Sequence, residues 1–222
     1  MHFLLIGATG RTGTLVLDEV LRRGHTVTAL VRDRSKVTPR DGLTLVEGTP
    51  LEPLDIEKAL AAAPSTPTNA AIVTLNTART SDNPFAAMVS PPQLMTQSMK
   101  NLVTALKATG VKKVVNLQAH GVGNSFPTLF FLMRVMVKKS NMSFSYKDHD
   151  SAETVLRESG LDFVFARPTR FTDGPAAPIH FYGDTGGGIG SFAGMSRRST
   201  AEFLVDAAEK KDWDGTTPVM SN

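Results

Sequence analysis

The sequence contains no cysteine, no long apolar run and no strong imbalance of charge. Without cysteine, the chain has no disulfide, no thiolate nucleophile and no cysteine-based metal site. No stretch approaches the about 18 consecutive apolar residues that indicate a membrane-spanning helix. The net charge is only +3, and like charges never form a block, so a nucleic-acid-binding surface has little support.

The first residues and the composition indicate a soluble globular protein. The opening stretch MHFLLIG is too short for the apolar part of a secretion signal and has no basic segment before it. Hydrophobic residues make up 41% of the chain and charged residues 20%, which is typical of a folded domain rather than a disordered chain. We therefore expect a cytoplasmic monomer or weak homodimer. Its partner should be a small-molecule substrate, with no nucleic acid, membrane or metal.

Short apolar segments alternate along the chain with segments of helical periodicity. Strands are expected at 3–6, 26–31, 43–48, 70–75, 112–117, 162–168 and 217–220. Helices are expected at 12–23, 53–63, 92–109, 150–156 and 199–210, the fourth opened by a capping box from Asp150 to Glu153. This alternation predicts one α/β domain over residues 1–222. We expect a Rossmann-like, doubly wound and mostly parallel sheet with helices on both faces.

Two segments, near 121–147 and 172–198, interrupt this alternation. Both follow late strands, where an open α/β sheet places its ligand crevice. The simplest interpretation of the first segment is a core helix with a flanking loop. The second is an apolar wall for a substrate, and the least favoured is a helix on a membrane surface. Its apolar residues include Phe126, Leu129, Phe130, Phe131, Met133, Val135 and Met136. The second segment is rich in glycine and is either a mobile lid or a surface loop.

Three glycines follow the first expected strand at intervals of three residues, in the stretch GATGRTG (7–13). A pyrophosphate site needs a glycine for a tight turn, one for close backbone approach and one for helix packing, followed by a helix N-terminus. The spacing is G-x-x-G-x-x-G rather than G-x-G-x-x-G, but the strand before it and the helix after it favour dinucleotide binding. The alternative is a tight turn that holds no ligand.

The residue after the second expected strand indicates which dinucleotide binds. An acidic residue at this place binds the ribose hydroxyls of NAD, whereas this chain has Arg32, whose guanidinium suits a 2′-phosphate. Arg11, inside the glycine turn, is placed to help from the other side. We therefore predict NADP(H) as the cofactor, and the alternative is that Arg32 is a solvated loop charge.

The stretches IGATGRTG, ALVRD, VTALKATGVKKVV and AETVLRESGLDFVFARPTRFTDGP resemble the NmrA-like, atypical short-chain dehydrogenase/reductase group. Within that group the pattern is most similar to the flavin reductase and biliverdin reductase B type, over nearly the whole chain. The resemblance implies a Rossmann domain that binds NADP(H) and passes hydride from the nicotinamide C4 to an electron-poor substrate. The cofactor contacts expected on this basis are Gly7, Thr9, Gly10, Arg11, Thr12, Gly13, Arg32, Thr49, Leu75, Asn76, Gln118, Pro168 and Thr169.

The chain departs from this group at two strand ends. The third strand of the group usually ends in Gly-Asp, with the acid on the adenine, whereas here it ends in Gly48-Thr49. That contact is lost or replaced by the backbone. The fifth strand of the group usually ends in a pair of hydroxyl residues near the substrate, whereas here it ends Leu117-Gln118-Ala119-His120. The hydroxyl expected beside the reacting centre is absent, so the mechanism of the group does not transfer directly.

The Tyr-x-x-x-Lys pair of many short-chain reductases is also absent from this sequence. The candidates that remain for catalysis near the crevice are Gln118, His120, Tyr146 and His149. His120 directly follows the fifth strand, and either donates a proton or only hydrogen-bonds a loop. His149 and Glu153 lie four residues apart on the expected helix and are most simply a surface pair. Glu153 stands where the flavin-reductase relatives carry a histidine.

A conjugated acceptor such as a flavin needs no dedicated acid, because its reduced form takes a proton from solvent. Such a site needs positioning and a dry pocket instead. We therefore expect an NADPH-dependent oxidoreductase that transfers hydride to a small aromatic or conjugated substrate, flavin-, quinone- or enone-like. Two alternatives stay open: an NADP(H) sensor that regulates a partner without turnover, and an isomerase or cyclase on the same scaffold.

Overall fold

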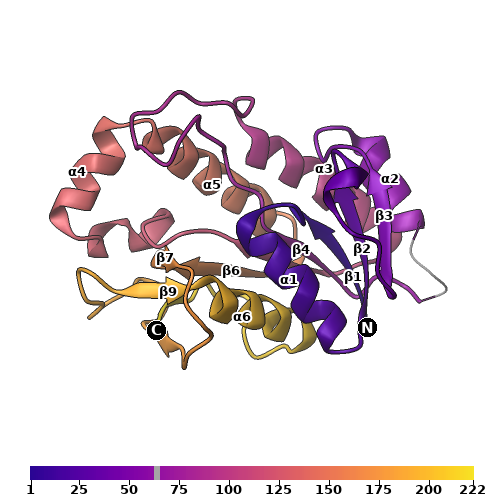
Figure 1. Ribbon diagram of the computed structural model, residues 1–222. Helices are drawn as coiled ribbons and strands as arrows, with labels where there is room; N and C mark the ends of the chain where they lie inside the picture. Colours follow the sequence, from indigo (N-terminus) through magenta and orange to yellow (C-terminus); the bar gives the residue numbers. More distant parts are fainter. Residues whose placement is uncertain (63–65) are drawn as a thin grey trace.

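Eight strands form one sheet in the order β3-β2-β1-β4-β5-β6-β10-β8, and helices lie on both of its faces (Figure 1). The computed structural model describes residues 1–62 and 66–222. Every neighbouring pair in this sheet is parallel except β10 and β8. The strands are β1 (His2–Ile6), β2 (Thr26–Val31), β3 (Leu43–Glu47), β4 (Ala70–Val73), β5 (Lys113–Leu117), β6 (Asp162–Pro168), β8 (His180–Phe181) and β10 (Val219–Ser221). The predicted doubly wound, Rossmann-like fold is therefore confirmed.

The helices divide between the two faces of the sheet. They are α1 (Arg11–Arg22), α2 (Pro53–Ala61), α3 (Leu94–Thr109), α4 (Phe131–Lys139), α5 (Met142–Arg157) and α6 (Arg197–Glu209). The alternation of side chains along a strand explains the two apolar cores: in β1, Phe3 and Leu5 pack with α1 and α6, whereas Leu4 and Ile6 pack with α2, α3 and α5. Among the described residues, no helix combines the length and the apolar character that crossing a membrane would require.

The order of the strands reverses beside β1. From β1 the chain builds outward through β2 to β3, and then returns to the other side of β1 to add β4, β5 and β6. In open sheets of this kind, the crevice at the carboxyl ends of the strands next to the reversal is where ligands bind. The glycine turn that follows β1 lies at this point.

The start of α5 differs from the prediction. The helix begins at Met142 rather than near Asp150, so the proposed capping box from Asp150 to Glu153 is wrong. The Asp150 carboxylate instead accepts a hydrogen bond of 2.7 Å from the backbone N–H of Gly123, in the 3-10 helix η2 (Gly123–Thr128). A contact between distant segments therefore uses the side chain that looked like a local cap. The helix expected at 53–63 is α2, and residue 63 lies outside the described residues.

A side chain of α5 caps the N-terminus of α3. The residue before α3 is Gln93, which has a φ of 57° and makes no cap with its own side chain. The buried Asp148 carboxylate instead accepts hydrogen bonds of 2.9 Å from the N–H groups of both Met95 and Thr96. This bond fixes α5 against α3, and both helices lie below the crevice.

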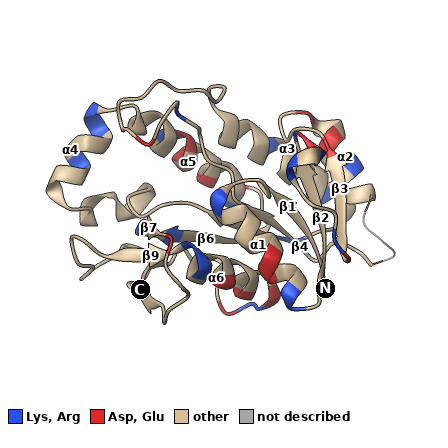
Figure 2. Ribbon diagram, in the orientation of Figure 1, with Lys and Arg blue, Asp and Glu red and all other residues tan. Residues whose placement is uncertain are grey.

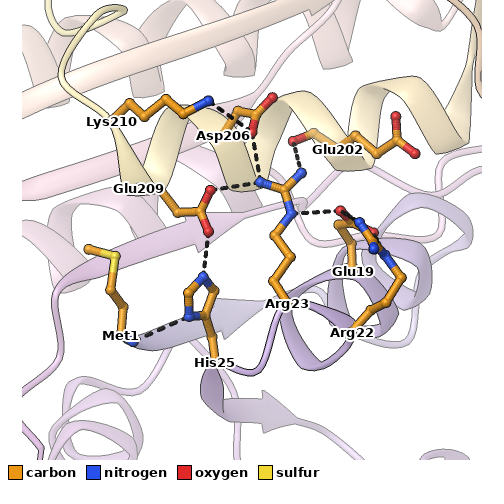
Figure 3. A network of polar contacts seen from close by, with 9 residues as sticks. All are labelled: Met1, Glu19, Arg22, Arg23, His25, Glu202, Asp206, Glu209 and Lys210. Carbon is orange, nitrogen blue, oxygen red and sulfur yellow. Dashed lines mark hydrogen bonds and ion pairs between the residues drawn. The ribbon is translucent and has the colours of Figure 1, made fainter.

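An ion-pair network joins α1 to α6 far from the glycine turn (Figure 3). Arg23, just after α1, contacts the carboxylates of Glu19, Asp206 and Glu209 at 2.6 to 2.7 Å. His25 contacts Glu209 as well. These contacts hold the two helices of one face together, so that the other end of α1 is presented rigidly to the crevice.

Candidate cofactor and substrate site

Backbone conformation and close contacts require glycine at two positions of the turn after β1. Gly7 has a φ of +99°, a conformation that side chains rarely adopt, and a Cβ on it would stand 2.6 Å from Oγ1 of Thr74. A Cβ on Gly13 would stand 2.0 Å from the carbonyl oxygen of Gly7. These contacts bring the start of α1 directly against the ends of β1 and β4. The close packing is the role expected of the last glycine in a dinucleotide-binding turn.

The exposed residues of this turn are accessible to a ligand. Thr9, Gly10 and Arg11 are exposed, whereas Thr12 and Gly13 are buried. The N-cap residue Gly10 has no side chain with which to cap α1, so the first N–H groups of the helix remain available to an external acceptor. A helix N-terminus of this kind favours an anion such as a pyrophosphate.

The Arg11 side chain extends across the crevice. Its guanidinium lies 3.3 Å from a carboxylate oxygen of Asp173 and 3.6 Å from one of Asp82. Asp82 follows β4, and Asp173 follows the short strand β7 (Arg170–Thr172), which pairs with β9 (Gly194–Ser196) in a separate two-stranded sheet. Arg11 thus points to the loops on the β4 and β6 side, whereas Arg32 lies after β2, on the other side of β1.

Arg32 is an exposed cation at the end of β2. Within the described parts of the chain it makes no ion pair, while its neighbour Asp33 bonds to Ser35 instead. A guanidinium without a carboxylate partner at this strand end is available for a phosphate group.

A carboxylate from α2 lies beside the end of β3. The Asp55 carboxylate, in the first turn of α2, accepts a hydrogen bond of 3.0 Å from the N–H of Thr49, and this bond lowers its pKa. A Cβ on Gly48 would stand 2.6 Å from the same carboxyl group. The strand end that lacks the Gly-Asp pattern therefore still has a carboxylate beside it.

The residues after β4 are held by α5. Leu75 is partly buried against the core of α2, α3 and α5. Asn76 is exposed, and its side-chain oxygen accepts hydrogen bonds from the N–H of Thr77 and from the Ser145 hydroxyl. Both residues therefore lie at the carboxyl end of the sheet, where cofactor contacts were expected.

Gln118 is not exposed to a ligand. It is buried, its side-chain oxygen accepts a 3.1 Å hydrogen bond from Nε of Arg167, and its NH₂ group lies 3.5 Å from the carbonyl oxygen of His149. This placement does not support the expectation that the Gln118 side chain acts at the reacting centre, because its polar atoms are engaged inside the protein.

Arg167 is the residue that the sequence analysis overlooked. It is completely buried in β6, and its guanidinium donates to Glu153 on α5 at 2.7 Å and to Asn124 in η2. It also donates to the carbonyl oxygen of Asp184 at 3.1 Å, in the glycine-rich segment. Both crevice segments are therefore tied to one buried cation. The signal in the sequence was a lone arginine in the otherwise apolar strand DFVFARP.

The His149–Glu153 pair is not a surface pair, which corrects the prediction. Both side chains are buried, and Glu153 binds Arg167 and Arg157. Burial alone would raise the pKa of Glu153, but Arg167 holds it below its ordinary value. Nδ1 of His149 has no hydrogen-bond partner in the described structure, and burial lowers the pKa of this histidine to about 4.

His120 contacts a loop rather than standing free in the crevice. Its Nε2 lies 2.9 Å from Oγ1 of Thr128, and that hydroxyl bonds to the carbonyl oxygens of Ser125 and Thr185. The hydroxyl proton is used on a carbonyl, so Nε2 of His120 is the donor to Thr128. Burial and the nearby Arg167 lower the pKa of His120 to about 4. The imidazole is therefore neutral at pH 7, and its one N–H is engaged.

Tyr146 is likewise a packing residue. Its hydroxyl donates to the carbonyl oxygen of His120 at 3.3 Å, and its ring lies against Gly121. Burial raises the pKa of Tyr146 to about 12. A phenol with this pKa stays protonated near neutral pH and is a weak general acid.

Pro168 and Thr169 complete the crevice at the end of β6. The carbonyl oxygen of Pro168 accepts the N–H of His120, which joins the ends of β5 and β6. Thr169 is buried, and its hydroxyl has no partner among the described residues. An orphaned hydroxyl at this place is a group that a bound ligand can satisfy.

The segment 121–147 is not a core helix, so the simplest interpretation of it is wrong. It forms η2, α4 and the start of α5, and in α4 the only fully buried residue is Val137. Phe131, Leu132 and Val135 are exposed. The glycine-rich segment is anchored rather than loose, because Asp184 and Thr185 accept hydrogen bonds from Arg167 and Thr128.

Taken together, these residues fit a dinucleotide. The crevice offers a glycine cradle that a Cβ would fill, an open helix N-terminus, an unpaired Arg32 and the orphaned hydroxyl of Thr169. The three side chains that the sequence suggested as acids, His120, His149 and Tyr146, have pKa values shifted away from pH 7. Within the described residues, no cluster of His, Asp or Glu could hold a metal ion.

Comparisons with known proteins agree with this geometry. The sequence model of a family described as NAD(P)H-binding matches residues 7–211. A 3-diazoavenalumate denitrifying reductase of a Streptomyces species is 31% identical over 116 residues, which are 52% of this chain and 36% of that protein. The aligned part is about a third of the length of the first curated relatives.

Solved structures share the fold along the full chain. An anaerobillin reductase from Escherichia coli O157:H7, ChuY, is 18% identical with a TM-score of 0.79, and the match covers 100% of this chain and 97% of that one. A short-chain dehydrogenase/reductase from Veillonella parvula in complex with NADP is 16% identical with a TM-score of 0.78, and it covers 100% and 94%. At these identities the likeness concerns the fold.

Proposed function

The chain belongs to the NAD(P)H-binding family, and on that premise we propose that it is an NADPH-dependent reductase that transfers hydride to a small aromatic or conjugated acceptor. The observation that carries the proposal is a glycine turn whose geometry suits a pyrophosphate, next to a crevice in which His120 and His149 both have a pKa of about 4. The reductase activity named for a Streptomyces relative and for ChuY supports the same reaction type.

The cofactor would be held by three elements. The turn at 7–13 and the first N–H groups of α1 bind the pyrophosphate, because they combine close backbone approach with a positive helix end. Arg32 binds the 2′-phosphate, which makes NADPH the preferred form. Thr169 orients the nicotinamide end through its free hydroxyl. The bound cofactor supplies the hydride, and the residues of the chain position the two reactants.

The class of acceptor follows from the lack of an acid. Reduction of a simple ketone needs a proton at the carbonyl oxygen in the same step, and such enzymes provide it from a side chain of suitable pKa. In this crevice the N–H of His120 is bound to Thr128 and the Tyr146 hydroxyl to a carbonyl oxygen. An acceptor that spreads the incoming negative charge over a conjugated system can take its proton from water afterwards. Flavins, quinones and enones are acceptors of this kind.

The proposal is tested by following NADPH oxidation against flavins, quinones, enones and saturated ketones, with cofactor binding titrated separately. We expect turnover with at least one conjugated acceptor and none with the saturated ketones. Reduction of saturated ketones at equal rates would contradict the acceptor class. NADPH binding without oxidation by any acceptor would contradict the reductase assignment.

The same lack of an acid supports one alternative, an NADP(H) sensor without turnover. A sensor needs the cradle and Arg32 but no reacting centre. It predicts that NADPH and NADP⁺ differ in their effect on a partner protein or on the protein's own conformation. The acceptor panel separates the two proposals, because a sensor leaves NADPH intact with every acceptor.

A further inference from the structure

Helix α4 presents an apolar face that is not covered by the rest of the chain. Val137 packs inward, and the opposite side of the helix carries Phe131, Leu132, Val135 and Met136. Phe131 is 61% exposed and Leu132 is 60% exposed. Because the exposed residues recur at intervals of three and four, they form one continuous stripe along the helix. Contiguous apolar surface of this kind marks an interaction site.

Apolar side chains of neighbouring segments extend this stripe. The ring of Phe192, which is 84% exposed, lies 5.9 Å from that of Phe130, directly before α4. On the other side, the Asn141 side chain donates to the carbonyl oxygens of Phe85 and Ala86, and the Phe85 side chain is exposed. Phe144, in the first turn of α5 directly after α4, is 59% exposed. The docking face is hereafter α4 with Phe85, Phe144 and Phe192.

Helix α4 carries basic side chains only. Arg134, Lys138 and Lys139 lie in it without any Asp or Glu. Lys147 is exposed one turn after the exposed Phe144 of α5. Figure 2 shows basic and no acidic residues along α4. The exposed Asp82, three residues before Phe85, is paired with Arg11, and Asp148 is buried as the cap of α3.

We propose that the docking face binds the surface of an anionic lipid bilayer. Large apolar side chains can enter the boundary between headgroups and acyl chains, and the lysines beside them can reach the phosphates of anionic lipids. A helix that lies in this plane needs a polar face and an apolar face, not the length of a membrane-spanning segment. From the sequence, no membrane partner was expected, and a helix on a membrane surface was the least favoured interpretation of this segment. The exposure of Phe131, Leu132 and Val135 now favours that interpretation.

The charge pattern disfavours the two other occupants. A symmetric dimer through this face would set Lys138 and Lys139 of one copy close to the same residues of the other, which is repulsive. A nucleic acid would use the lysines, but aliphatic side chains such as Leu132, Val135 and Met136 offer no stacking platform for bases. The surface of an anionic bilayer matches both the apolar stripe and the basic side chains of α4.

The proposal is tested by sedimentation of the full chain with vesicles of phosphatidylcholine alone or of phosphatidylcholine mixed with phosphatidylglycerol. We expect binding to the mixed vesicles that is at least about tenfold tighter than to the neutral ones and that weakens in high salt. Phe131→Ser with Leu132→Ser should weaken binding by at least about tenfold, and so should Lys138→Glu with Lys139→Glu.

Matched controls use exposed residues of the same types elsewhere. Leu54→Ser on α2 and Lys211→Glu after α6 should bind vesicles like the parent. NADPH affinity shows that each variant is folded. Equal binding to neutral vesicles, or α4 variants that bind like the parent, would overturn the proposal. So would a dimer that Phe131→Ser dissociates, or a similar affinity for RNA.

Discussion

At the residue scale, the crevice combines an arginine that has no carboxylate partner among the described residues with histidines that are kept neutral. Arg32 makes no ion pair in the described structure, whereas the guanidinium groups of Arg11 and Arg167 are occupied by carboxylates. His120 and His149 both have a pKa of about 4, chiefly because they are buried. The free arginine affects which cofactor is preferred. The neutral histidines affect how stability depends on pH.

Replacing Arg32 with alanine should remove the preference for the phosphorylated cofactor. We expect the parent to bind NADPH at least about tenfold tighter than NADH, and Arg32→Ala to bind the two equally by losing affinity for NADPH alone. Isothermal titration with each cofactor measures this. Arg34→Ala, two residues along and also exposed, serves as the control and should keep the preference. A preference that survives Arg32→Ala would exclude this residue as the 2′-phosphate reader.

Adding a methyl group at Gly13 should abolish cofactor binding. The new Cβ would stand 2.0 Å from the carbonyl oxygen of Gly7, so the turn must open and its N–H groups lose their arrangement. Titration with NADPH should show affinity lower by about a hundredfold or more for Gly13→Ala. Gly190→Ala is the matched control, because nothing lies within 4 Å of the Cβ there. Unchanged affinity in Gly13→Ala would mean that the turn does not hold the cofactor.

The buried His149 should make the protein less stable in mild acid. The unfolded state takes up a proton near pH 6.5, whereas the native state does so only near pH 4, so lowering the pH between these values favours unfolding. We expect the free energy of unfolding to fall between pH 7 and pH 5, and to fall by about 1 kcal/mol less in His149→Gln. Urea unfolding at both pH values measures this. His180→Gln, an exposed site, should behave like the parent; an identical fall in His149→Gln would contradict the argument.

At the element scale, the two crevice segments are joined through β6. The buried guanidinium of Arg167 connects α5, η2 and the glycine-rich segment, so these three elements are held in place relative to one another. The carboxylate of Glu153 neutralises the buried Arg167. A small change to the Glu153–Arg167 pair should therefore have a large effect on the stability of the fold.

Removing the charge of Glu153 should destabilise the whole fold. Glu153→Gln leaves the Arg167 guanidinium buried without its carboxylate, which costs about 3–5 kcal/mol. Glu158→Gln, at an exposed position directly after the same helix, should change stability by less than about 0.5 kcal/mol. Denaturant unfolding compares the two. If both variants match the parent, the buried pair does not hold these elements together.

Local sequence patterns predicted most elements but not the contacts between them. The seven expected strands all exist, and their ends lie within two residues of the prediction, because buried parallel strands are nearly continuous apolar runs. The start of α5 was missed, because Asp150 resembles a cap but bonds to Gly123 from a distant loop. The exposure of α4 was missed as well, because its apolar residues look the same in a core and on a surface.

At the scale of the whole molecule, the glycine turn and the order of the strands agree. The turn follows β1, and β1 lies where the strand order reverses, so sequence and topology point to the same crevice. The place of the glycine turn in the fold could therefore be predicted from the sequence. The burial of Gln118 and His149 could not, because it depends on Arg167 and on loops that no local pattern places.

The most direct test of hydride transfer uses NADPH carrying deuterium at the transferable C4 position and an enone acceptor. We expect the reduced enone to carry that deuterium on its β-carbon, because hydride adds to the electron-poor end of the conjugated system, and to carry a hydrogen from solvent on its α-carbon. Mass spectrometry and proton resonance of the product show both positions. NADPH that is bound but never consumed, or a product without deuterium, would contradict the assignment.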